Sequence, residues 1–192
     1  MGIGKQAKIL SRQQVDAVAD HIGKRRHGLR NQVIFLLSVR AGLRAKEIAA
    51  LKWSMVVDAD GMVGDCIHLT NAASKGNSGR VIPLNRQLRS LLTRHHQTAT
   101  VSEFVIQTER SDRTSAQTIV NLFARWYHDL GLVGCSSHSG RRTFITNAAR
   151  KISTVGGSLR DVQSLAGHSS LQTTQRYIEC DAEARRRVVE LV

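Results

Sequence analysis

The chain of 192 residues lacks several features that would place it in a particular class of protein. It contains one proline, no low-complexity tract and no internal repeat, so neither a repeat array nor a chain with an obvious interdomain linker is expected. Nowhere do 18 apolar residues follow one another, and the N-terminus has no signal-peptide core. We therefore expect a single-domain cytoplasmic protein that makes no membrane contact.

Cysteine is also scarce. Cys66, Cys135 and Cys180 are an odd number at wide spacing, which indicates reduced thiols and neither a disulfide framework nor a zinc site. Cys66 and His68 share one face of a predicted strand, but two ligands do not complete a metal site. The sequence thus predicts no metal and no cofactor.

Acidic residues are few, because 15 Asp and Glu stand against 28 Lys and Arg, for a formal net charge of +13. The excess is mostly arginine, whose planar fork matches phosphate, so the composition predicts a nucleic-acid partner. The alternative is a generally basic, solvated surface. No tight carboxylate cluster appears, which disfavours a metal-dependent nuclease.

The spacing of apolar residues predicts a mainly α-helical domain over residues 11–178, with a basic lead-in, residues 1–10, and a tail, residues 179–192. Ser11 and Gln14 form a capping-box signal for the first helix. Further helices are expected over residues 29–40, directly after Arg44, and over residues 86–97, 115–130, 140–152, 159–165, 171–178 and 182–190.

Between the third and fourth helices the helical periodicity stops. Val56-Val57 and residues 66–69 are predicted strands joined around Asp60-Gly61, and residues 80–84 are a third strand. The expected fold class is therefore mainly α with a small three-stranded antiparallel β-sheet.

Five polar residues next to predicted helices form a candidate phosphate-handling set: Arg44, His138, Arg141, His168 and Tyr177. Two guanidiniums can grip a phosphate through paired hydrogen bonds, two imidazoles can move protons, and a phenol can attack phosphorus. This chemistry can break a nucleic-acid strand without a metal.

Each residue also has a structural interpretation when taken alone. Arg44 could form a surface ion pair with Glu47, and His138 could simply cap a helix. A lone tyrosine is usually a packing residue, as we expect for Tyr127. Lys75 lies in a glycine-rich turn, where a lysine is most often solvated.

Four blocks in order resemble the catalytic domain of the tyrosine recombinases, the phage-integrase family. They are Ala41-Gly42-Leu43-Arg44-Ala45-Lys46-Glu47, then Lys75-Gly76-Asn77 with Arg80-Val81-Ile82-Pro83-Leu84, then His138-Ser139-Gly140-Arg141, and finally Ala166-Gly167-His168-Ser169-Ser170 with Thr173-Thr174 and Tyr177. The resemblance covers about residues 9–180. Gly140 and Arg142 depart from the family, which often has Leu and His there, and the glycine could loosen the helix start.

The resemblance implies a site-specific DNA recombinase or integrase in which Tyr177 attacks a phosphodiester and forms a 3′-phosphotyrosyl bond. Lys75 would protonate the departing 5′-oxygen, and His138 would help to remove the tyrosine proton. The implied catalytic residues are Arg44, Lys75, His138, Arg141, His168 and Tyr177, with Glu47 in support, and the implied DNA contacts are Lys46, Lys75, Arg80 and Arg142.

Four strand cuts imply a homotetramer on double-stranded DNA, with residues 179–192 packed on a neighbour. The chain begins almost where a catalytic domain begins, so it resembles minimal bacterial or phage members such as the fimbrial phase-variation invertases, or a catalytic fragment. Members of the family usually carry an N-terminal helical domain that clamps the other face of the DNA. Without such a domain less DNA surface would be contacted, so the resemblance also implies an accessory DNA-bending protein. Two alternatives stay open: a non-catalytic DNA-binding regulator derived from a recombinase, and a type IB topoisomerase-like strand relaxer.

Overall fold

The structure is a computed structural model that describes residues 7–74, 78–98, 102–178 and 189–190. Lys75 and nearly all of the predicted tail and last helix lie outside the described residues. In the part that is described, no helix is long and apolar enough to cross a membrane.

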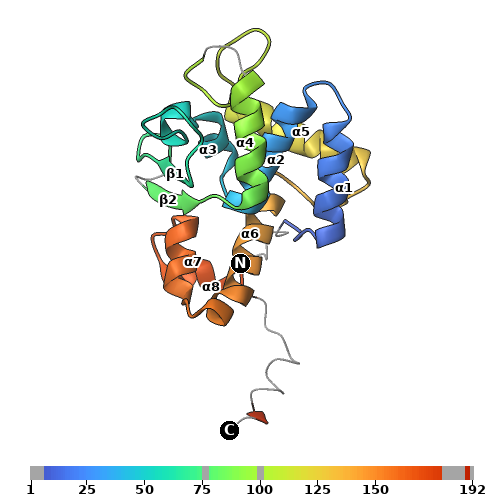
Figure 1. Ribbon diagram of the computed structural model, residues 1–192. Coiled ribbons are helices and arrows are strands. Elements are labelled where there is room, and N and C mark those ends of the chain that lie inside the picture. The colour runs from blue at the N-terminus through green and yellow to red at the C-terminus, as the bar shows by residue number, and fades with distance from the viewer. Residues whose placement is uncertain (1–6, 75–77, 99–101, 179–188, 191–192) are drawn as a thin grey trace.

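Most of the elements form an N-terminal part, residues 7–129, which occupies the upper half of Figure 1. Its elements are α1 (Arg12–Gly23), α2 (Gly28–Ala41), α3 (Ala45–Ala49), the 3-10 turn η1 (Trp53–Met55), β1 (Cys66–Leu69), β2 (Arg80–Pro83), α4 (Arg86–Thr98) and α5 (Ala116–Asp129). The buried helix α2 lies among α1, α3 and α4, and supplies much of one continuous apolar core.

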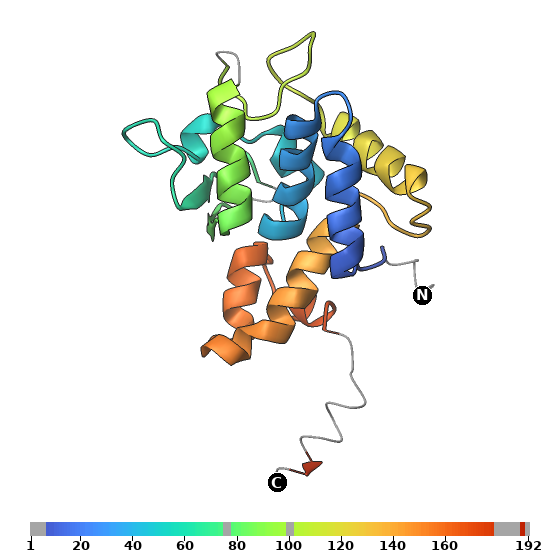
Figure 2. The same cartoon turned by 45° about the vertical axis from the view of Figure 1, so that its right-hand side comes forward.

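A smaller C-terminal part, residues 139–178, lies below it. Its elements are α6 (Ser139–Lys151), η2 (Ile152–Val155), α7 (Leu159–Ala166) and α8 (Leu171–Gln175). Figures 1 and 2 show α6 running from the N-terminal part down to α7 and α8. Its own fully buried apolar cluster has only three members: Ile145, Val162 and Ala166.

Local sequence signals set several element ends. The Ser11 hydroxyl accepts a hydrogen bond from the Gln14 N–H, and the Gln14 side chain accepts one from the Ser11 N–H, so the predicted capping box starts α1. Gly42 ends α2 in the left-handed region at φ 67°, where a side chain would also meet the ring of Phe144 at 2.5 Å. The turn at Gly42 directs the chain into Arg44 and α3.

Gly140 brings α6 close to α2. A Cβ at this position would collide with Ser38 and approach Val39 of α2 at 3.1 Å, and Gly140 is buried. The missing side chain therefore permits close packing of α6 on α2 there, while the expectation that this glycine loosens the start of α6 stays a prediction.

Two predictions are corrected. The sheet has two antiparallel strands, β1 and β2, and the predicted strand at Val56-Val57 is reduced to a single bridge between Val57 and Val63. The reason is that the N–H groups of Val56 and Val57 both donate hydrogen bonds to the carbonyl of Trp53 in a 3-10 turn, so they do not pair with a neighbouring strand. The helix predicted over residues 171–178 is also shorter, since α8 ends at Gln175, two residues before the candidate tyrosine.

Candidate active site

Arg141 lies in the first turn of α6 and joins three segments of the chain. Its Nη1 donates to the Gly42 carbonyl at 2.6 Å, and its Nη2 donates to the Ala166 carbonyl at 2.6 Å and to His168 Nε2 at 3.0 Å. Only 4% of Arg141 is exposed. Burial, followed by the positive charges of Arg44 and Arg80, lowers the pKa of Arg141 to about 10, so the guanidinium remains charged at neutral pH.

Arg44 is held by a buried carboxylate. Arg44 precedes α3 and donates through Nη1 to Glu47 Oε1 at 2.7 Å, while the backbone N–H of Arg44 donates to Glu47 Oε2 at 2.9 Å. Arg80, from β2, donates to both oxygens of Glu47 at 3.1 Å. Burial raises the pKa of Glu47, but the hydrogen bonds and charges of Arg80 and Arg44 together keep it below its usual value. Glu47 is therefore a charged anchor between two arginines.

Arg80 is itself almost enclosed. Its side chain is 4% exposed, and its Nε donates to the Leu165 carbonyl at the end of α7 at 2.8 Å. Arg80 thus connects β2 and Glu47 of the N-terminal part to α7 of the C-terminal part.

His168 follows Gly167, which ends α7 at φ 60° and where a side chain would meet Arg80 Nη1 at 2.8 Å. The imidazole makes two contacts, Nε2 with Arg141 Nη2 and Nδ1 with Thr174 Oγ1, each at 3.0 Å. Burial, then the charges of Arg141 and Arg44, lower the pKa of His168 to about 4. His168 is consequently neutral at physiological pH.

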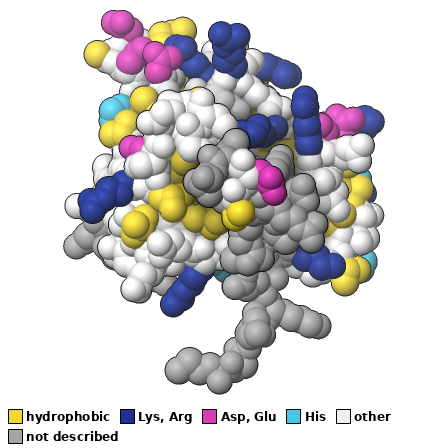
Figure 3. Space-filling view, turned by 90° about the horizontal axis from the view of Figure 1, so that it is seen from below, with side chains coloured by type: hydrophobic (Ala, Val, Ile, Leu, Met, Phe, Trp, Pro, Cys, Tyr) yellow, Lys and Arg dark blue, Asp and Glu magenta, His cyan; other side chains and the backbone are white. Residues whose placement is uncertain are grey.

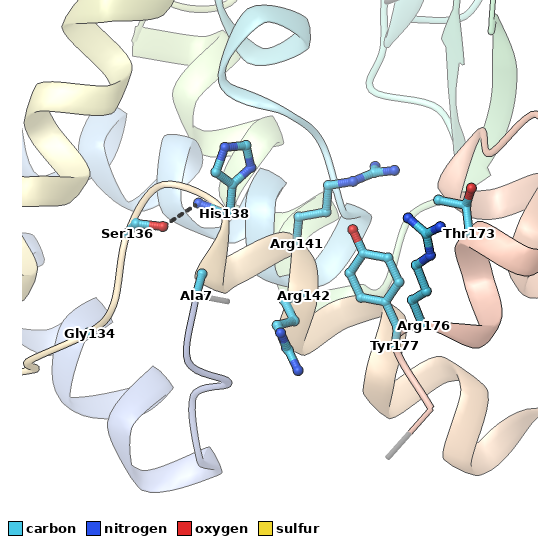
Figure 4. A pocket seen from close by; sticks show the side chains of 9 residues that line it. All are labelled: Ala7, Gly134, Ser136, His138, Arg141, Arg142, Thr173, Arg176 and Tyr177. Carbon is cyan, nitrogen blue, oxygen red and sulfur yellow. Dashed lines mark hydrogen bonds between the residues drawn. The ribbon is translucent and has the colours of Figure 1, made fainter. Parts of the chain in front are cut away.

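Tyr177 lies against His168. Their rings stack with centroids 5.4 Å apart and an interplanar angle of 23°. The Thr146 hydroxyl of α6 donates to the Tyr177 carbonyl at 3.0 Å, which fixes the backbone behind the ring. Figure 4 shows the phenol oxygen directed toward the side of the cavity that carries Arg141. The structure therefore brings Tyr177, His168 and Arg141 of one chain together.

A cavity of about 400 Å³ is lined by the phenol of Tyr177 and by the predicted residues at the start of α6. His138, exposed, and Arg142, half-buried, line it, and so does Arg176, which the sequence did not single out. In Figure 4 the side chain of Arg141 lies between the imidazole of His138 and the phenol of Tyr177. His138 thus shares the cavity with Tyr177.

A second cavity of about 760 Å³ borders the first, and Thr173 lines both. Arg44 and His168 line it together with Arg160 and Gln163 of α7. The sequence offered no motif for Arg160 or Gln163. Arg160 is exposed, whereas Gln163 is half-buried and its Nε2 donates to the His168 carbonyl at 3.0 Å. Lys46, which the sequence predicted to contact DNA, is exposed but lies in a separate hollow beside Arg113.

Seen from below, Lys and Arg side chains are spread across the face and are more numerous than acidic ones (Figure 3). Among the residues that the structure describes, no group of three His, Cys, Asp or Glu side chains is placed to hold a metal ion.

A comparison with protein families matches residues 8–184 to the Phage integrase family. The chain belongs to this family. Two curated relatives of this integrase-family chain are 30% identical to it: the tyrosine recombinase XerA of Thermococcus onnurineus, over 95% of the chain, and XerC of Pelobacter propionicus, over 79%. The chain spans 62% and 48% of the length of these relatives.

Solved integrase structures show the same fold. The Tn1549 transposon integrase in complex with a circular intermediate DNA has a TM-score of 0.78 at 15% identity, over 99% of this chain and 67% of that one. The XerA recombinase has a TM-score of 0.74 at 22% identity, over 95% of this chain and 64% of that one. The prediction of a mainly helical recombinase catalytic-domain fold is therefore confirmed.

Proposed function

We propose that this integrase-family chain is a site-specific DNA recombinase that cleaves and rejoins strands through a 3′-phosphotyrosyl bond at Tyr177. The observation that supports this most is the contact of Tyr177 with His168, and of His168 with the buried guanidinium of Arg141. A phenol is a weak nucleophile unless positive or proton-accepting groups surround it. Here the phenol lies beside them in the same chain.

In this mechanism the scissile phosphate binds where the two cavities meet. Arg44 and Arg141 stabilise the charge that develops on its non-bridging oxygens, because preorganised donors act strongly in a partly enclosed site. The tyrosine oxygen bonds to phosphorus as the 5′-oxygen leaves. The tyrosine proton passes to His138 or water, and the 5′-oxygen takes a proton from Lys75, which lies outside the described residues.

Arg80 takes a different part from the DNA contact that the family resemblance implied. Both of its Nη groups donate hydrogen bonds to Glu47 and its Nε donates to the Leu165 carbonyl, so the guanidinium has few N–H groups to offer to DNA. We assign it as a positioning residue that fixes Glu47 and through it Arg44. Arg160, exposed at the second cavity, is the better candidate for a contact with the phosphate backbone.

The partners follow from the reaction. Double-stranded DNA is the substrate, and a homotetramer supplies the four active sites that recombination needs. A solved lambda integrase dimer bound to a COC′ core site, from a protein 20% identical to this chain, supports DNA as the partner and more than one protomer on it.

Covalent capture from a pool of nicked duplexes with random sequence tests the proposal without knowledge of the target site. The parent chain becomes linked to DNA that survives denaturation, and Tyr177→Phe does not, while it still binds duplex DNA. Tyr127→Phe is the matched control, because that hydroxyl is buried and has no hydrogen-bond partner among the described residues. We expect it to cleave like the parent.

The other results of this experiment are equally informative. DNA binding without an adduct in the parent would contradict the recombinase and support the regulator. An adduct with plasmid relaxation but no recombinant product would support the topoisomerase-like alternative.

A further inference from the structure

Thr174 is a buried hydroxyl in contact with the candidate catalytic histidine. It lies on α8, three residues before Tyr177, and is 0% exposed. Its Oγ1 is 3.0 Å from His168 Nδ1. Neither the sequence motifs nor the proposed mechanism gives this hydroxyl a task.

The contacts of His168 define which of its nitrogens carries the proton. A guanidinium N–H can only donate, so His168 Nε2, 3.0 Å from Arg141 Nη2, must accept. A neutral imidazole has one N–H, which is then on Nδ1 and is donated to Thr174 Oγ1. In the DNA-free protein His168 is therefore the Nδ1–H tautomer.

The Nδ1–H tautomer of His168 cannot donate a hydrogen bond from Nε2 to a phosphate oxygen. Phosphate oxygens accept hydrogen bonds, whereas Nε2 of the resting tautomer presents a lone pair to the site where Arg141 is found. A phosphate oxygen that accepts the hydrogen bond of Arg141 Nη2–H leaves His168 Nε2 without a donor. The lone pair of Nε2 then faces a second acceptor, the phosphate oxygen. His168 can assist the phosphate only after a proton has moved to Nε2.

We propose that Thr174 is a positioning residue that allows His168 to exchange tautomers when a phosphodiester binds. Without DNA the hydroxyl accepts from Nδ1–H, and with DNA it turns and donates to Nδ1, while Nε2–H donates to the phosphate. One proton leaves Nδ1 for water and one arrives at Nε2 from water, so no net proton is taken up. The identity of the anion rests on the proposed function, but the resting tautomer does not.

Threonine suits this task because a hydroxyl both donates and accepts. The surroundings also favour exchange over full protonation, since Arg141, Arg44 and Arg80 all face His168 with positive charge and Tyr177 stacks on its ring. These charges oppose an imidazolium but do not distinguish the two neutral tautomers by net charge.

Nitrogen-15 spectra of the imidazole test the resting state directly, with the His168 signals assigned from their loss in His168→Gln. In the parent and in Thr174→Ser we expect a protonated Nδ1 and an unprotonated Nε2. Thr174→Val keeps the shape but removes the hydroxyl, so we expect a mixture of tautomers. A protonated Nε2 in the DNA-free parent would overturn the proposal.

Inorganic phosphate, titrated into the same samples, stands in for the diester. Its binding should move the proton to Nε2 in the parent and in Thr174→Ser. Protonation of both nitrogens, or an unchanged His168 spectrum up to the solubility limit of phosphate, would contradict tautomer exchange.

Cleavage supplies a second readout. Adduct formation by Thr174→Val should be slower by about tenfold, the worth of one net hydrogen bond, while Thr174→Ser stays within about twofold of the parent. In a His168→Gln background the valine change should have no further effect, because Thr174 acts through His168. An equal loss in both backgrounds would show a merely structural role. If the parent forms no adduct, the proposed function fails, and the spectra still decide the tautomer.

Discussion

The N-terminal and C-terminal parts of the molecule are each stabilised by different forces. The N-terminal part, which supplies Arg44, is built around a continuous apolar core that includes nearly all of α2. The C-terminal part, which supplies Arg141, His168 and Tyr177, has a buried apolar cluster of three residues. Hydrogen bonds from Arg141 and Thr146 of α6 hold Ala166 and Tyr177 within this part, and those of Arg80 to Leu165 and of Arg141 to Gly42 join it to the N-terminal part. The difference shows that the candidate catalytic arginine is also a structural link.

This arrangement has a consequence for local stability. A small cluster loses little burial when it opens, so the C-terminal part should open at lower free energy than the N-terminal part. The nucleophile then lies on the more easily displaced element, and the guanidiniums that receive the phosphate lie on or against the more stable one. Substitutions at the connecting residues separate these two contributions.

The largest effect is expected for Arg141→Gln. It leaves the buried carbonyls of Gly42 and Ala166 without their charged donor, which should lower the free energy of unfolding by about 3 kcal/mol and remove detectable adduct formation. Denaturant unfolding and hydrogen exchange measure it, and exchange should rise most in α7 and α8. Arg125→Gln, an exposed position on α5, is the control and should change stability by less than about 0.5 kcal/mol. Uniformly faster exchange in both parts would refute the link.

A smaller effect is expected from pH, and it should differ between the two parts. His168 in the C-terminal part and His95 in the N-terminal part both have lowered pKa values, chiefly because of burial. The unfolded chain binds protons near pH 6.5, before the folded protein does, so stability is lost as the pH falls from about 6.5 toward 4. Since His168 is partly exposed, its share of the slope should stay below about 1 kcal/mol per pH unit.

Substitution assigns this loss to the two histidines. In His168→Gln the acid sensitivity of exchange in α7 and α8 should decrease, and in His95→Gln that of the N-terminal part should decrease. A pH profile that neither substitution alters would contradict the assignment.

The smallest effect on the fold is expected for Arg160→Gln, on the exposed face of α7. Stability should not change, but affinity for duplex DNA should fall and the slope of log K against log salt should decrease by about 0.9, the value for one lost phosphate contact. Lys24→Gln, at an exposed position at the end of α1, is the control and should change neither the affinity for duplex DNA nor the salt slope. Fluorescence anisotropy over a range of salt concentrations measures both, and an equal slope for the two variants would remove Arg160 from the DNA path.

The sequence by itself determined the elements whose signals are local. The capping box of Ser11 and Gln14 and the glycine at position 42 set helix ends, and apolar spacing set the helices, because each depends on neighbours a few residues away. The strand at Val56-Val57 was predicted wrongly because a 3-10 turn used its N–H groups, which no periodicity reveals.

The composition and motifs also indicated which residue types handle phosphate, but only the tertiary structure decided what each one contacts. Arg80 and Arg160 are both arginines in basic surroundings, yet one is enclosed by Glu47 and the Leu165 carbonyl and the other is exposed at a cavity. Thr174 and Thr173 are adjacent in sequence, yet only Thr174 reaches the imidazole of His168. Burial and hydrogen-bond direction arise from segments far apart in the chain, and those are set when the two parts pack against each other.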